Sequence, residues 1–483
     1  MTLLILGHDF SYEMECLVRL FYPGERIAIT KEGPETPDAI CTEMRLDAGG
    51  LLLRVRVCLG EYDREQSERG ADLPQAERER RLSVLLFELL CEQTGTRPRW
   101  GILTGVRPVR FCHHLLDAGK TPAEGIKWLE NTRLVERPKA QLAMETAQVQ
   151  RPMLRAGDKR DFSLYIGIPF CPSRCLYCSF VSESVARAGK LVPRYVELLC
   201  EELREIAKIV REHSLVLRTV YWGGGTPTSL EPEQLTAILH TLQSEFELGQ
   251  LDEYTVEAGR PDSITEEKLE RLRQYSVGRI SINPQTLNDN VLREIGRTHT
   301  VEQFFGSFAL ARRAGFPVIN TDLIAGLPGE SKQSFLEGMR GILGLRPENI
   351  TLHTLTVKRS ATLRRRADAF EAAGGLSYWL DEAAALLRAA GYRPYYLYRQ
   401  KGARENLENV GYSLPGAESD YNVAMMEEVQ TVLGAGAGAV SKLYAGPGQI
   451  GRVFNFKYPF EYNERFGEII DRKSALRRFY EAI

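Results

Sequence analysis

The chain has 483 residues, of which 43% are hydrophobic and 26% charged, and its formal net charge is −2. This composition is that of an ordinary globular protein, and the near-zero charge gives no reason to expect a nucleic-acid or anionic-membrane partner. No apolar run approaches the roughly 20 residues of a membrane span. The N-terminus lacks the basic segment and cleavage site of a signal peptide, and nine irregularly spaced cysteines fit a reducing compartment, so we expect a cytoplasmic protein.

Residues 1–155 are expected to form an N-terminal α+β domain without a catalytic signature. Apolar patterning predicts a helix at 75–93 and strands at 3–6, 26–30 and 51–58. The segment 100–110 combines glycines with arginines on a predicted loop, which either binds an acidic group or packs as a turn against the next domain. Residues 150–161 have the composition of a linker.

Strands and helices alternate strictly in the segment that follows, for which we set the domain bounds at 162–375. The predicted strands are 164–168, 218–222, 253–257, 278–282, 317–323 and 350–355. The predicted helices are 192–211, 231–245, 265–274, 287–294, 301–313 and 331–344. This order predicts a parallel sheet in an α/β fold, either an open barrel or a doubly wound sheet, with the chemistry at the carboxyl ends of the strands. A third domain is expected at 376–483 and opens with a helix at 378–390.

Three cysteines, Cys171, Cys175 and Cys178, follow the first of these strands with the spacing C-x3-C-x2-C. Three thiolates on one loop can hold three irons of a cubane [4Fe–4S] cluster and leave the fourth iron open to a substrate or cofactor. A structural zinc site usually takes four ligands in two pairs, and no second pair lies nearby. Buried free cysteines are common, but three within eight residues are unusual. We therefore predict a cluster.

Polar and glycine residues follow the later strands. The three glycines 223–225 with Thr226 would let a backbone approach a ligand, or else form a tight turn. Glu257 would accept hydrogen bonds from a ribose or an amine, or else act as a surface or capping acid. Asp322 is costly to bury without a partner. Arg297 would hold a carboxylate or form a surface ion pair.

Together, three motifs resemble radical S-adenosylmethionine (SAM) enzymes: the Tyr-x-x-Ile-Pro-Phe-Cys lead with the cysteine loop, the Gly-Gly-Gly-Thr-Pro-Thr turn, and Asp-Leu-Ile-x-Gly-Leu-Pro. Within them the chain resembles the oxygen-independent coproporphyrinogen III oxidase (dehydrogenase) branch, in its bacillus and clostridium type. The resemblance implies a partial (β/α)6 barrel between the N-terminal α+β domain and a C-terminal, mostly helical or mixed domain. It also implies that the three cysteines ligate the cluster and that the open iron binds SAM.

The resemblance further implies which residues surround the cofactor. Tyr165 belongs with the cysteines at the catalytic centre. The family's contacts to one SAM molecule, or to two, fall on Tyr165, Gly224, Gly225, Thr226, Glu257, Gln285, Arg297, Asp322 and Thr356. The segment after His353, which contains Thr356, departs from the family pattern.

The implied activity is oxidative decarboxylation of coproporphyrinogen III to protoporphyrinogen IX in haem biosynthesis, with electrons from a flavodoxin- or ferredoxin-type donor. Because the tetrapyrrole carries several carboxylates, a basic rim is expected at Arg107, Arg110, Arg399 and Lys401. Phe180 and Gly167 stand where the oxidases carry a further cysteine and a histidine. Two alternatives within the family therefore remain, a haem chaperone and a methyl- or alkyl-transferase acting on a tetrapyrrole or another substrate.

Overall fold

The computed structural model describes residues 1–33, 37–154, 158–356 and 375–482. It divides into two compact units. Unit 1 comprises Met1–Ala147 together with Arg399–Leu407, and unit 2 comprises Gln148–Tyr398 and Glu408–Ile483. The domain bounds set from the sequence remain a proposal. Within the described ranges, no helix is both long enough and apolar enough to cross a membrane.

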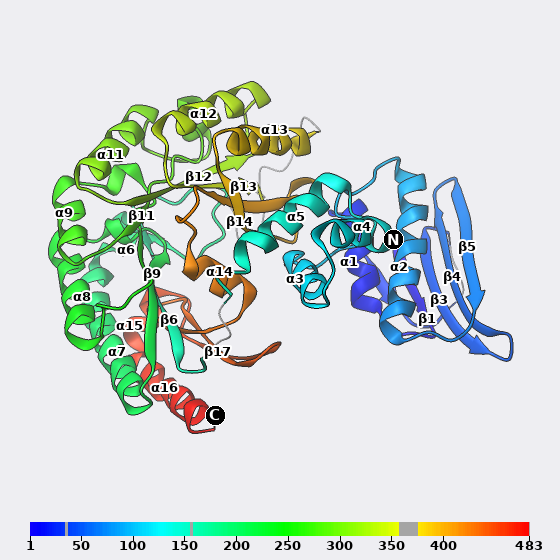
Figure 1. The fold of residues 1–483 in the computed structure, drawn as a ribbon, viewed down its shortest axis with the longest axis horizontal. Helices are drawn as coiled ribbons and strands as arrows, with labels where there is room; N and C mark the ends of the chain where they lie inside the picture. Colours follow the sequence, from blue (N-terminus) through cyan, green and yellow to red (C-terminus); the bar gives the residue numbers. More distant parts are fainter. Residues whose placement is uncertain (34–36, 155–157, 357–374, 483) are drawn as a thin grey trace. The chain divides into compact units, whose positions relative to one another are not determined.

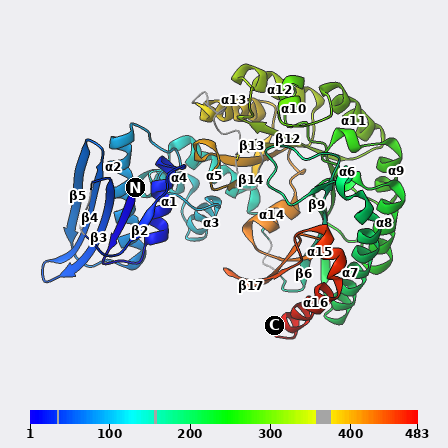
Figure 2. The ribbon, with the colours of Figure 1, turned by 180° about the vertical axis from the view of Figure 1, so that it is seen from behind.

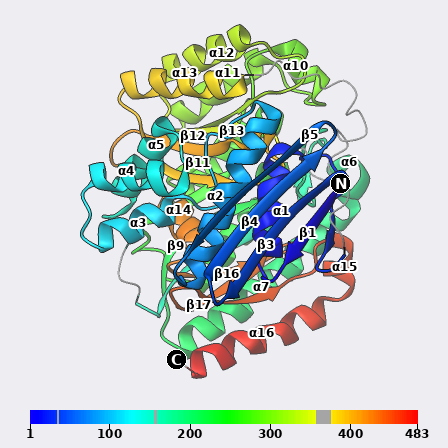
Figure 3. The ribbon, with the colours of Figure 1, turned by 90° about the vertical axis from the view of Figure 1, so that its right-hand side faces the viewer.

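Unit 1 is built on a five-stranded sheet of order β2-β1-β3-β4-β5. Strands β1, β3, β4 and β5 are labelled in Figure 3. The strands are β1 (Thr2–Leu6), β2 (Ala28–Thr30), β3 (Ala39–Asp47), β4 (Gly50–Leu59) and β5 (Tyr62–Gly70). The helices are α1 (Ser11–Phe21), α2 (Gln75–Thr94), α3 (Val109–Asp117), α4 (Pro122–Arg133) and α5 (Arg137–Gln150), the last running into unit 2. The strands and the helix predicted in this region are confirmed, with shifts of a few residues at their ends.

The two faces of this sheet differ because side chains alternate along a strand. Leu53 and Val55 of β4 are buried in one core with α1 and α2. Arg54 lies on the opposite face and pairs with Glu43 and Glu65 of the neighbouring strands. The N-terminal α+β prediction is thereby confirmed for unit 1.

Unit 2 contains six parallel strands in sequential order, β6 (Asp161–Ile168), β9 (Val216–Gly224), β10 (Glu253–Glu257), β11 (Arg279–Ser281), β12 (Val318–Ala325) and β13 (Asn349–Thr354). The intervening helices are α7 (Val192–Glu212), α8 (Pro232–Glu245), α9 (Glu266–Gln274), α10 (Asp289–Glu294), α11 (Val301–Arg313) and α12 (Lys332–Leu345). Each predicted strand and helix of this segment is found.

The sequential strand order decides between the two architectures left open by the sequence. In a doubly wound sheet the strand order reverses at a switch point, and helices then cover both faces. Where the strands follow one another in sequence order and every connection between them is right-handed, all helices lie on the same face. Helices α7, α8, α9, α11 and α12 lie along the outer side of the curved sheet (Figure 1, Figure 2). The end strands of this series, β6 and β13, pair on their free sides with strands from the chain after residue 375 and not with each other, so the described strands form an open, partial (β/α)6 barrel.

The chain after residue 375 extends both edges of the same sheet. Strand β15 (Glu408–Ser413) pairs antiparallel with β13, and β16 (Thr431–Ala435) pairs parallel with β6. The remaining elements are α13 (Leu376–Ala389), β14 (Arg393–Arg399), α14 (Asp420–Glu427), β17 (Val440–Gly446), β18 (Gln449–Phe454), α15 (Pro459–Glu464) and α16 (Phe466–Glu481). The region is mixed in character, and the helix predicted at 378–390 is α13.

A buried polar cluster holds the C-terminal segment against the barrel. Glu202 of α7 and Lys473 of α16 are 0% and 1% exposed, and their charged atoms lie 2.5 Å apart. Glu202 also accepts hydrogen bonds from the Gly436 amide, the Asn455 side chain and the Tyr462 hydroxyl. This cluster fixes the turn after β16 beside β6. The two segments are so close that a Cβ added to Gly436 would lie 2.3 Å from the Gly167 carbonyl oxygen.

Candidate active site

The cysteine loop begins directly after β6, at the carboxyl end of the sheet, and starts with the short strand β7 (Phe170–Cys171). Cys175 is buried, and Cys171 and Cys178 are partly buried. The loop is held in place by main-chain hydrogen bonds, including one from the Leu176 amide to the Ile295 carbonyl at 3.0 Å. The structure thus brings the three predicted cluster ligands together on one ordered loop.

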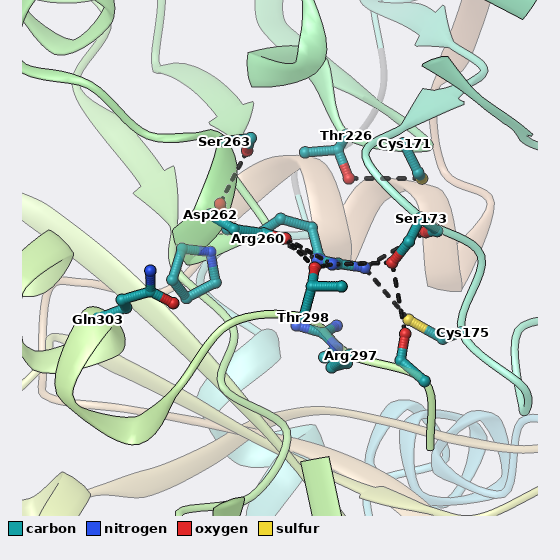
Figure 4. Close-up of polar contacts among 12 residues, drawn as sticks. Cys171, Ser173, Cys175, Thr226, Arg260, Asp262, Ser263, Arg297, Thr298 and Gln303 are labelled. Atoms are coloured by element: carbon teal, nitrogen blue, oxygen red, sulfur yellow. Dashed lines mark hydrogen bonds and ion pairs between the residues drawn. The ribbon is translucent and has the colours of Figure 1, made fainter. Parts of the chain in front are cut away.

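Polar donors surround the cysteine sulfurs. The Thr226 hydroxyl donates to Cys171 Sγ at 3.5 Å, and Arg260 Nη1 donates to Cys175 Sγ at 3.5 Å (Figure 4). Burial raises the pKa of the Cys171 thiol, and it raises the pKa of Cys178 to about 11. A metal must therefore displace protons from these thiols, while the donors are placed to stabilise the resulting thiolates.

A single zinc ion and buried free cysteines were the alternatives to a cluster. Within the described ranges, no group of three His, Cys, Asp or Glu side chains could hold one metal ion. A cubane cluster makes a different demand, because each of its irons takes its own thiolate. The three loop cysteines would supply one thiolate for each of three irons.

The glycine turn after β9 packs against the cysteine loop. Gly224 has φ +104°, and a Cβ on Gly225 would lie 2.5 Å from the Phe170 carbonyl oxygen. The amide of Gly225 donates to the Ile168 carbonyl at 2.8 Å, and the amide of Thr226 donates to the Phe170 carbonyl at 2.7 Å. The tight-turn interpretation therefore accounts for these two amides, while the Thr226 side chain contacts the sulfur of Cys171.

Two carboxylates lie inside the barrel. Glu257 ends β10, and its Oε1 accepts a hydrogen bond from the Tyr221 hydroxyl at 2.5 Å. Burial raises the pKa of Glu257 to about 7. Asp322 of β12 accepts a hydrogen bond from Asn320 at 2.8 Å and lies 3.5 Å from His353 Nε2. Burial raises the pKa of Asp322, but the hydrogen bond and charge of His353 and the hydrogen bonds from Asn320 and Thr351 together outweigh burial, so the pKa falls below its usual value.

Aromatic rings line the barrel beside these carboxylates. The ring of Tyr165 stacks on Tyr221 with centroids 6.5 Å apart, and Tyr221 stacks on Tyr421 of α14 at 4.3 Å. Sequence reasoning identified Tyr165 but missed Tyr221, Tyr421 and His353. Tyr221 and His353 sit on predicted strands one or two residues from their ends, which was the available signal. Tyr421 had none, because it comes from a helix far along the chain.

The remaining predicted contacts lie around the same end of the barrel. Arg297 is 8% exposed, which removes the surface ion-pair interpretation, and it donates to the Asn283 carbonyl at 2.7 Å. Gln285 has φ +71° and donates its amide to the Asp322 carbonyl at 3.1 Å. Thr356 is partly buried and donates to the Thr354 carbonyl at 3.2 Å.

Several buried polar atoms at this end have no partner among the described residues, namely Gln285 Oε1, Arg297 Nε and the Tyr421 hydroxyl oxygen. Buried polar groups are normally hydrogen-bonded, and exceptions point to a ligand or a water molecule that binds there. An acceptor, a cationic donor and a hydroxyl near two carboxylates suit a polar cofactor with both amine and carboxylate groups. The residues present therefore fit SAM.

The expected basic rim is not supported at Arg399. Its side chain is 6% exposed within unit 1, where it donates to the main-chain carbonyls of Leu103 and Asn406 and lies over the Trp100 ring. Arg399 therefore ties its own segment into unit 1. Lys401 donates to the Tyr12 hydroxyl at 2.6 Å in the same unit.

Comparisons with known proteins agree with this geometry. The family model described as radical SAM superfamily matches residues 165–340. The oxygen-independent coproporphyrinogen-III oxidase-like protein HemZ of Bacillus subtilis is 41% identical over 400 residues, covering 81% of this chain and 79% of that protein. The heme chaperone HemW of Lactococcus lactis is 33% identical over 293 residues, covering 57% and 68%. The solved coproporphyrinogen III oxidase (HemN) from Escherichia coli, a radical SAM enzyme, superposes with TM-score 0.51 at 24% identity, covering 67% of this chain and 73% of its own.

Proposed function

The chain belongs to the radical SAM superfamily, in the family of oxygen-independent coproporphyrinogen-III oxidase-like proteins, and from this membership we propose that it oxidatively decarboxylates coproporphyrinogen III. The family's cofactors are a [4Fe–4S] cluster and SAM. One observation carries the proposal. The similarity to HemZ covers 81% of the chain, a larger share than the 57% covered by the similarity to the HemW of Lactococcus lactis.

In the proposed site, Cys171, Cys175 and Cys178 would hold the cluster, and the barrel end would hold SAM. When bound, the reduced cluster and SAM supply the hydrogen-abstracting power that unactivated carbon requires. For each propionate converted to a vinyl group, the substrate would release one CO2, pass one hydrogen atom to the SAM-derived fragment and pass one electron to an acceptor.

The chain's own side chains would bind and orient the reactants. Arg297 presents a buried guanidinium whose Nε lacks a partner among the described residues, which suits a carboxylate. Glu257 and Asp322 offer carboxylate acceptors for amine or hydroxyl groups. The stacked rings of Tyr165, Tyr221 and Tyr421 would exclude water from the reacting carbon.

A haem chaperone is the second candidate. It is favoured by the similarity to HemW and by Phe180, a side chain 67% exposed that stands where the oxidases resembling this chain carry a further cysteine. A chaperone needs a haem site and no decarboxylation, so the two functions differ in their products.

The test is an anaerobic assay of the reconstituted protein with dithionite, SAM and coproporphyrinogen III, followed by mass spectrometry. Stepwise loss of two carboxyl groups, with about one 5′-deoxyadenosine per vinyl group, would support the proposal. Stoichiometric haem binding without decarboxylation would favour the chaperone, and S-adenosylhomocysteine would indicate methyl transfer. The Cys175→Ala variant serves as the cluster-free control and should lose both the cluster absorbance and SAM cleavage.

A further inference from the structure

A buried arginine lies between the cluster loop and the turn that follows β10. Arg260 directly precedes the short 3-10 helix η3 (Pro261–Ser263), and its side chain is 3% exposed. It forms a two-pronged ion pair with Asp262, with Nε 2.9 Å from Oδ1 and Nη2 2.7 Å from Oδ2 (Figure 4). A planar guanidinium held in this way has one fixed orientation.

The remaining N–H groups of Arg260 reach the cluster loop and a second loop. They donate to the Ser173 carbonyl at 3.3 Å, to the Ser173 hydroxyl at 3.1 Å and to the Thr298 hydroxyl at 3.0 Å. Thr298 in turn donates to Asp262 at 2.5 Å, and Ser173 donates to the Gly296 carbonyl at 3.3 Å. Three segments distant in sequence are thus joined through one side chain.

The contact that bears on chemistry is the one to Cys175. Arg260 Nη1 lies 3.5 Å from Cys175 Sγ, and the cysteine is 8% exposed. Hydrogen bonds and charges near cluster sulfurs set the reduction potential of an iron–sulfur cluster, and burial strengthens their effect. Asp262 lies on the other side of the guanidinium, with its side chain 15% exposed, so the pair is a dipole whose positive end faces the sulfur.

We propose that the Arg260–Asp262 pair positions Cys175 and sets the reduction potential of the cluster. Adding an electron makes the cluster more negative, so the guanidinium stabilises the reduced form more than the oxidised form. The carboxylate acts in the opposite sense and, being nearer to solvent, acts more weakly. The pair therefore balances ease of reduction against reducing power.

A purely structural role makes a different prediction. If the network only ordered the loop, loss of either partner would loosen Cys175 and move the potential in the same direction. An electrostatic role requires opposite signs. Arg260→Gln should make the midpoint potential more negative, and Asp262→Asn should make it more positive.

The experiment is a redox titration of the reconstituted protein, monitored by the signal of the reduced cluster in electron paramagnetic resonance, without SAM or tetrapyrrole. We expect Arg260→Gln to shift the reduction equilibrium about tenfold, which is about 59 mV for one electron, and Asp262→Asn to shift it a few-fold the other way. Arg271→Gln on α9 removes the same charge from an arginine 42% exposed and should leave the potential unchanged.

Shifts of the same sign in both variants, or shifts no larger than in the Arg271→Gln control, would overturn the proposal. If Arg260→Gln takes up no cluster, Asp262→Asn decides alone by the sign of its shift. A folded Asp262→Asn apoprotein that takes up no cluster would also count against the proposal. Because the titration contains no tetrapyrrole, its outcome is independent of the decarboxylation assay.

Discussion

Replacing Gly225 by alanine should separate the glycine turn from the cluster loop. The added Cβ would lie 2.5 Å from the Phe170 carbonyl oxygen, 2.8 Å from the Phe170 amide nitrogen and 2.9 Å from the Ile168 carbonyl oxygen. Ordinary van der Waals contact of a Cβ with neighbouring heavy atoms lies at 3.4–4 Å. All three neighbours are main-chain atoms, so no side-chain rotation can relieve the overlap, and β6 and β9 must move apart at their carboxyl ends.

The cost follows from the same contacts. Overpacking of this kind costs about 1–3 kcal/mol. Displacement also weakens the hydrogen bond of the Gly225 amide to the end of β6 and that of the Thr226 amide to the cluster loop, at about 1 kcal/mol each. We expect the Gly225→Ala apoprotein to lose about 3–5 kcal/mol of unfolding free energy in urea denaturation. Because the displaced residues flank Cys171, the iron content after reconstitution should also fall well below that of the wild type.

Gly306→Ala is the matched control. Gly306 lies within α11, and a Cβ there meets nothing within 4 Å. The same chemical change should be neutral or stabilise by up to about 1 kcal/mol, since alanine is the better helix former. A Gly225→Ala protein with the stability and iron content of the Gly306→Ala protein would refute the reasoning about the turn.

Further predictions concern the buried polar groups. Lys473→Met leaves Glu202 buried without its cation and should cost about 3–5 kcal/mol in urea denaturation, whereas adding Glu202→Gln should restore part of that loss. If the double variant is no more stable than Lys473→Met alone, the ion pair is not the cause. The pKa of Glu257 is raised from 4.5 to about 7, so its neutral form favours folding below pH 4.5, and that stability should be lost as the pH rises through about 7. At about 1.4 kcal/mol per unit of pKa shift, the loss of unfolding free energy is about 3 kcal/mol. The Glu257→Gln variant should lack this contribution to the pH dependence of thermal unfolding, and equal pH profiles of the variant and the wild type would contradict this. Tyr221→Phe removes a hydrogen bond that lowers the pKa of Glu257, so the pH transition should move upward, and an unmoved or lowered transition would argue against that hydrogen bond.

Local sequence patterns were sufficient to locate the elements of the barrel. Helical and strand periods depend on residues a few positions apart, which is why β9, β10 and α7 to α12 were found within a few residues of their ends. The cysteine spacing also acts locally, since one loop carries all three thiols. Glu257 and Asp322 were identified because they lie near the carboxyl ends of predicted strands, where the chemistry of such a fold is expected.

Other features depended on contacts between distant segments. Arg260 gave no signal in the sequence, because its bond to Cys175 joins residues 85 positions apart. The burial of Arg399 within unit 1 does not support its assignment to the basic rim, and the sequence could not show this because burial depends on what packs around a side chain.

The sequence by itself determined the α/β alternation, the three-cysteine motif and the family resemblance, because each rests on residues that are neighbours in the chain. Only the tertiary structure decided the open single-wound barrel, the strands that the C-terminal segment adds to both edges of its sheet, and the pairing of Glu202 with Lys473. Those features arise when topology brings remote segments together in a low-dielectric interior, where buried charges and polar groups must find partners. The same condition placed Arg260 beside the cysteine sulfur.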